Sequence, residues 1–189
     1  MPFYKFGLNA ILIAVMLLPC QTAWSDDNSR FMALFSYEVQ NRAFALLSVS
    51  DAEATRKGEI DGEFWAAYHR LEALNQQMYT AHANQYQIDM SPTTMTEIKN
   101  CLAGSIGNLF PETGVSIMRD ATIDYIEKLK ELESLADPED KAFFNYVVMQ
   151  EEVQAQTLSL YIDQKHEEAV KVFDDFINQQ QSKNIGSLI

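Results

Sequence analysis

Apolar residues recur at intervals of three and four along most of this chain, and no window shows sustained alternation of apolar and polar residues. The first pattern is typical of amphipathic helices and the second of half-buried strands. We therefore expect an all-α protein. Five or six helices joined by short connections predict an antiparallel bundle.

Helix start and stop signals divide the chain into segments. Asp61 is expected to cap one helix, and Asp137 followed by Pro138 is expected to open another, because proline is tolerated in the first helical turn. The expected segments are 29–49, a short helical turn at 50–57, 61–86, 91–109, a helix that opens at Pro111, and 137–163 with a kink at 164–166 before a last stretch to about residue 180.

The first 25 residues have the features of a secretory signal. Lys5 supplies a positive charge, residues 10–18 are uninterrupted apolar sequence, and Pro19 interrupts the helix after them. Ala23 and Ser25 are small residues at the −3 and −1 positions of a cleavage site. We expect residues 1–25 to be a cleavable signal peptide, which indicates a periplasmic or secreted protein.

Two alternatives to cleavage after Ser25 stay open. Leu17 to Cys20 resembles a bacterial lipoprotein signal, in which Cys20 would be lipidated and would anchor the protein. An uncleaved anchor is disfavoured, because the apolar run is shorter than the roughly 20 residues that cross a bilayer. If Cys20 leaves with the signal, Cys101 is alone and no internal disulfide can form; its expected role is that of a small buried apolar residue.

Residues 26–181 are then one helical-bundle domain, and 182–189 a flexible tail. Without Lys5 the mature chain has 13 basic and 27 acidic residues, a formal charge of −14. Such a surface repels phosphate and disfavours nucleic acid as a partner. No membrane span is expected after cleavage. The expected partners are a protein or a small-molecule ligand in the cell envelope, and the sequence does not fix the oligomeric state.

No complete catalytic motif is present: the sequence lacks a phosphate-binding glycine loop, Cys-x-x-Cys, His-Glu-x-x-His and Gly-x-Ser-x-Gly. Carboxylates on apolar helix faces remain. Glu38 lies within the apolar stripe of the first helix, and Glu151 within that of the long later helix. A buried carboxylate is costly unless it is paired or bound to a metal. His69 and Glu72 share a face on another helix, three residues apart.

These residues resemble the ferritin-like family of helical bundles, whose di-metal members use one Glu from each of two helices and Glu-x-x-His from each of the other two. The resemblance implies that Glu38 and Glu151 or Glu152 act as metal ligands, with His69 and Glu72 beside them, and that iron or manganese is the cofactor. The pattern departs from the family, since His69-x-x-Glu72 is reversed and Gln154 and Ala155 stand where histidines would follow the later acids.

Each candidate also has a structural interpretation. Glu38 can pair with Arg42 one turn later, Glu151 and Glu152 can form a solvated helix edge, and His69 can flank Trp65. Because no catalytic set is complete, we expect an exported helical-bundle protein without catalytic activity and without a cofactor, which binds a protein or small ligand. A ferritin-like metal-binding protein is the alternative.

Overall fold

The computed structural model of this chain describes residues 27–93 and 111–186, and within them it is all-helical, without strands. This confirms the expected all-α fold. The helices are α2 (Asp27–Arg56), α3 (Gly62–Gln85), α5 (Pro111–Leu135), α6 (Lys141–Ile162) and α7 (His166–Gly186).

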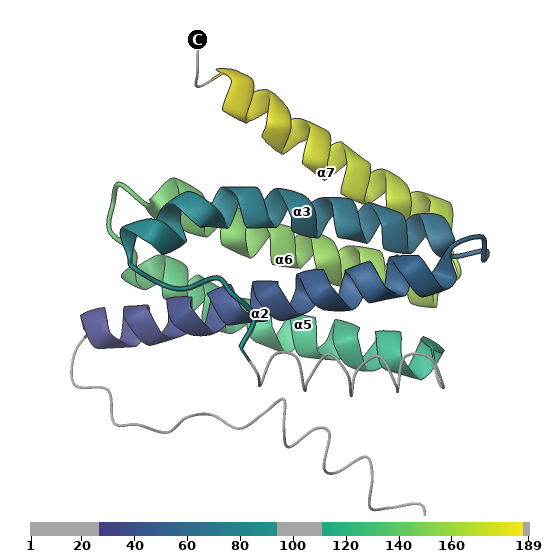
Figure 1. The fold of residues 1–189 in the computed structure, drawn as a ribbon, viewed down its shortest axis with the longest axis horizontal. Helices are drawn as coiled ribbons and strands as arrows, with labels where there is room; N and C mark the ends of the chain where they lie inside the picture. The colour runs from purple at the N-terminus through teal and green to yellow at the C-terminus, as the bar shows by residue number, and fades with distance from the viewer. Residues whose placement is uncertain (1–26, 94–110, 187–189) are drawn as a thin grey trace, which may run out of the picture.

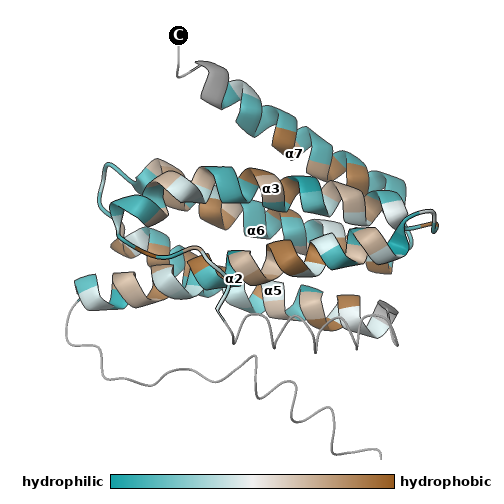
Figure 2. Ribbon diagram, in the orientation of Figure 1, coloured by the Kyte–Doolittle hydropathy of each residue, from teal (hydrophilic) through white to brown (hydrophobic). Residues whose placement is uncertain are grey.

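Two antiparallel helix pairs form the body of the molecule (Figure 1). Helix α2 packs against α3, α5 packs against α6, and α2 also contacts α5, which joins the two pairs. Helix α7 turns back at the end of α6 and lies on both α3 and α6. Every helix carries hydrophobic and hydrophilic residues along its length (Figure 2), as expected for helices that bury one face.

Helix boundaries differ from the expected ones in four places. Helix α2 continues without interruption to Arg56, so that no separate turn begins at Ser50. Helix α6 begins at Lys141, with Asp140 as its N-cap residue, after a turn at 138–140. The expected kink at 164–166 is a complete break, because Gln164 has a φ of 61° and ends α6. Helix α7 then extends to Gly186, beyond the expected start of the tail.

The turn between α2 and α3 depends on glycine and on one buried acid. Gly58 has a φ of +89°, and a Cβ on Gly62 would lie 2.7 Å from the carbonyl oxygen of Arg56. Asp61 precedes α3 as predicted, but its side chain makes no capping bond to that helix. It instead accepts hydrogen bonds from Arg56, Trp65 and Tyr161, which ties the turn to the end of α6.

Aromatic side chains fill the two ends of the core. One group lies between the start of α2, the end of α3 and the start of α6: Phe31, Phe35, Tyr86, Phe143 and Phe144. The other lies between α3, the end of α6 and α7: Phe64, Trp65, Tyr68, Tyr161 and Phe173. Between these two groups, the stretches of α2, α3 and α6 carry buried polar residues.

Several sequence predictions concern residues outside the described ranges. These are the signal peptide at 1–25 with Cys20, most of the helix expected at 91–109 with Cys101, and the last residues of the tail. Among the helices that are described, none is both long and apolar enough to cross a membrane.

Candidate functional site

A single arginine lies at the centre of the polar part of the core. Arg42 projects from the middle of α2 and is only 4% exposed. Its three guanidinium nitrogens each face a different glutamate: Nε lies 3.0 Å from Glu38 Oε1, Nη1 2.9 Å from Glu72 Oε1, and Nη2 3.0 Å from Glu151 Oε2. The glutamates are 0–2% exposed and come from α2, α3 and α6. The contact at Nε is an ion pair without hydrogen-bond geometry. We call these four residues the Arg42 cluster.

Three buried amides complete the contacts of the cluster. Gln150 Oε1 accepts hydrogen bonds from Arg42 Nη1 at 3.2 Å and from Asn75 Nδ2 at 3.0 Å, and another from Gln154. Gln154 Nε2 donates to Glu72 Oε1 at 3.1 Å, and Asn75 Nδ2 donates to Glu72 Oε2 at 3.1 Å. These bonds supply partners that buried charges would otherwise take from water.

Four tyrosines donate their hydroxyl protons into the network. Tyr79 on α3 donates to Glu38 Oε1 at 2.6 Å, and Tyr125 on α5 donates to Glu38 Oε2 at 2.8 Å. Tyr68 donates to Gln154 Oε1, and Tyr146 donates to Asn75 Oδ1. Through Tyr125, all four helices of the two pairs contribute to the same buried network.

The electrostatics of the cluster follow from its burial. Burial by itself lowers the pKa of Arg42, but Glu151, Glu72 and Glu38 outweigh burial and raise this pKa well above the usual range. Burial raises the pKa of Glu72, and Arg42 and Asn75 act against this rise. A fully buried ion pair is expensive to desolvate, and it is stable only when further hydrogen bonds satisfy the remaining atoms. In the Arg42 cluster, the buried amides and tyrosines supply these further hydrogen bonds.

The structure brings together three of the five carboxylates and histidines that the sequence singled out. Glu38, Glu72 and Glu151 meet around Arg42, which confirms the Glu38–Arg42 pair. His69 lies apart from them, where Nδ1 contacts Glu53 on α2. Glu152 is exposed. Within residues 27–93 and 111–186, no group of three or more His, Cys, Asp or Glu side chains is arranged to hold a metal ion.

Sequence reasoning missed most of the neutral partners in the network. Asn75 follows Glu72 by three residues, and Gln154 follows Glu151 by three residues. This is the spacing at which a second side chain on the same helix face reaches the same site. The amide residue three positions after Glu72 and after Glu151 was therefore a usable signal. Tyr125 on α5 had no such signal, because its partner Glu38 is 87 residues away.

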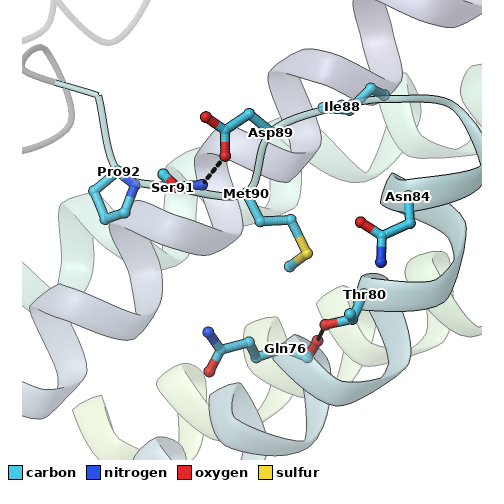
Figure 3. A pocket seen from close by; sticks show the side chains of 8 residues that line it. All are labelled: Gln76, Thr80, Asn84, Ile88, Asp89, Met90, Ser91 and Pro92. Carbon is cyan, nitrogen blue, oxygen red and sulfur yellow. Dashed lines mark hydrogen bonds between the residues drawn. The ribbon is translucent and has the colours of Figure 1, made fainter.

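A shallow surface pocket lies at the end of α3 and in the segment that follows it (Figure 3). It has a volume of about 420 Å³ and is open to solvent. Asp89 is the only charged residue among the described residues that line it, and its Oδ1 accepts a hydrogen bond from the Ser91 amide at 2.8 Å. Gln40 on α2 holds the segment by donating to the carbonyl oxygens of Asp89 and Ser91. The pocket is lined by Gln76, Thr80, Asn84, Ile88, Asp89, Met90, Ser91 and Pro92.

In comparisons with known proteins, no protein-family model, curated protein or solved structure matches this chain. Its function therefore has to be inferred from its own residues and their geometry.

Proposed function

We propose that this chain is an exported cell-envelope protein of ferritin-like layout that binds a protein or small ligand and has no catalytic activity. In this proposal Arg42 takes the place of a metal centre. The observation that carries it is the contact of all three guanidinium nitrogens with buried glutamates from three helices. The guanidinium of Arg42 thus supplies the positive charge that a metal ion from solution would supply in a metal-binding bundle.

The positions of the network residues support the ferritin-like layout. The di-metal bundles use a single Glu on each of two helices and Glu-x-x-His on each of the other two. Here Glu38 is the acid that α2 contributes to the Arg42 cluster, and Tyr125 donates to it from α5. On α3 and α6, Glu72-x-x-Asn75 and Glu151-x-x-Gln154 keep the spacing, with amides in place of histidines. Amides that donate to a carboxylate suit a guanidinium-centred network better than a metal site.

The filled interior also supports surface binding over catalysis. The Arg42 cluster is engaged with its own amides and tyrosines and is almost inaccessible to solvent. A catalytic group has to come within hydrogen-bonding reach of a substrate, and these groups would have to break mutual contacts to do so. A ligand is better accommodated on the outer surface of this strongly acidic chain, whose formal net charge is −13.

Metal analysis of the purified protein tests the central part of this proposal. After expression in medium supplemented with iron and manganese, we expect far less than one metal ion per chain, because Arg42 occupies the centre of the three carboxylates. Glu72→Gln should leave the metal content unchanged. Stoichiometric iron or manganese that is lost in Glu72→Gln would overturn the proposal in favour of the metal-binding alternative.

Export is tested separately by the mass of the mature chain. When the full-length chain is expressed in a Gram-negative host, we expect the periplasmic fraction to contain a protein that begins at Asp26, measured by intact mass spectrometry. A diacylated product that begins at Cys20 would show that the protein is exported and anchored by lipid, and that it is not released by cleavage after Ser25. A cytoplasmic product that retains residues 1–25 would contradict export altogether.

A further inference from the structure

The Arg42 cluster contains more negative than positive groups. Arg42 supplies one positive charge, and Glu38, Glu72 and Glu151 supply three negative charges when all are ionised, which is a net charge of −2. All four side chains are at most 4% exposed. Desolvation of an uncompensated charge costs several kcal/mol, and a buried acid under this penalty takes up a proton instead.

We propose that the cluster is a binding site for one proton, which Glu151 holds in mildly acidic solution and releases to solvent in mildly alkaline solution. This inference does not depend on the proposed function, because it rests on the charge balance and the hydrogen bonds of the cluster.

The hydrogen bonds distinguish Glu151 from the other two acids. Glu38 accepts from two tyrosines, one on each oxygen, in addition to its contact with Arg42. Glu72 accepts from Arg42, Gln154 and Asn75, again through both oxygens. The contacts of Glu151 with Arg42 and Gln150 both reach Oε2. Donors stabilise the charged form of a carboxylate, so the acid with the fewest donors keeps the proton.

The electrostatic surroundings of Glu151 support this assignment. Burial raises its pKa to about 7, with Arg42 acting against the rise and Glu38 and Glu72 adding to it. The neighbouring tyrosines stay neutral, since burial raises the pKa of each well above the usual range. The titratable groups that act on Glu151 or respond to it are Arg42 and Glu38 on α2, Glu72 and Tyr68 on α3, and Tyr125 on α5.

Helix α7 also packs on α6 and makes ring contacts with it at residues before and after Glu151. Phe176 contacts Tyr146, and His166 contacts Tyr161. Tyr161 lies ten residues after Glu151, which corresponds to roughly 15 Å along a helix. The histidine of α7 is therefore too distant to exchange the proton directly.

The effect on stability has a definite sign. An unfolded glutamate has a pKa of about 4.3, and the folded value for Glu151 is higher, so the folded state binds the proton more tightly. The contribution to stability is fully present below about pH 4.3 and is lost as the pH rises through about 7. The thermal midpoint should therefore decrease as the pH is raised from about 4.3 to about 7, and this contribution should level off at higher pH.

Infrared titration of the folded protein tests the site directly, because the C=O stretch of a protonated carboxyl group is separate from the carboxylate bands. At about pH 6 we expect one buried carboxyl band, which loses half its intensity near the pKa of about 7. Glu151→Gln should remove the band and flatten the fall in thermal midpoint. It should fold normally, since an amide has the shape of a protonated acid.

Glu152→Gln is the matched control, because this neighbour is exposed and outside the cluster. It should keep both the band and the pH dependence of the wild type. Absence of a titrating carboxyl band from the wild type would overturn the proposal. A band that persists in Glu151→Gln would assign the proton to another acid and overturn the role of Glu151, as would failure of this variant to fold.

Discussion

Arg42→Met is expected to destabilise the protein by about 3–5 kcal/mol at neutral pH, because it removes the one cation and leaves Glu38, Glu72 and Glu151 buried without it. Methionine keeps much of the side-chain volume. The loss of stability is therefore due more to the missing charge than to a cavity. Globular domains are stable by only about 5–15 kcal/mol. Urea unfolding followed by circular dichroism measures the change.

The pH dependence of this loss identifies its cause. Without Arg42 the three acids are still harder to ionise in the folded state, so the variant should lose more stability than the wild type as the pH rises from about 5 to about 8. Arg70→Met is the control: Arg70 forms an exposed ion pair with Asp174, and such pairs contribute about 0–1 kcal/mol. Similar losses in the two variants would show that Arg42 does not hold the core together.

The sequence predicted the fold more completely than the site. The spacing of apolar residues was sufficient for an all-α protein, because each helix buries one face. Helix ends were less predictable. Asp61 looked like a cap and does precede α3, yet its carboxylate bonds with Arg56, Trp65 and Tyr161. Two of these partners lie within five residues of Asp61, but Tyr161 lies 100 residues away, and no local pattern could indicate it.

For the site, sequence reasoning found the acids but not what they bind. Glu38 and Glu151 lie within apolar stripes, and both are buried. The alternative of a solvated helix edge was therefore wrong for Glu151, although Glu152 is exposed. Arg42 was recognised only as the partner of Glu38 one turn away. The same guanidinium also reaches Glu72 and Glu151, because α2, α3 and α6 come together at this level. The spacing of residues along one helix carries no information about that packing. His69 shares a helix face with Glu72 in the sequence, but it turns to Glu53 in the fold.

Phe35→Ala is expected to cost about 3–5 kcal/mol, the range for removing a large buried aromatic side chain. Phe35 on α2 is fully buried. Its ring joins α2 to the start of α6 and to the end of α3, with centroids 5.1 Å from Phe144 and 5.6 Å from Tyr86. Loss of the ring leaves a cavity where these elements meet. Chemical denaturation gives the size of the effect, and Ile123→Ala, at an exposed position on α5, should change stability by no more than about 0.5 kcal/mol.

Phe35→Ala and Arg42→Met should differ in their response to pH, although their costs at neutral pH are similar. The cavity removes apolar contacts and no charge, so its cost should be nearly the same at about pH 5 and about pH 8. The cost of Arg42→Met should grow over the same interval, because it depends on the ionisation of three buried acids. If the cost of Phe35→Ala also grew with pH, the aromatic end of the core and the Arg42 cluster would be energetically coupled. The inference that they contribute to stability independently would then be wrong.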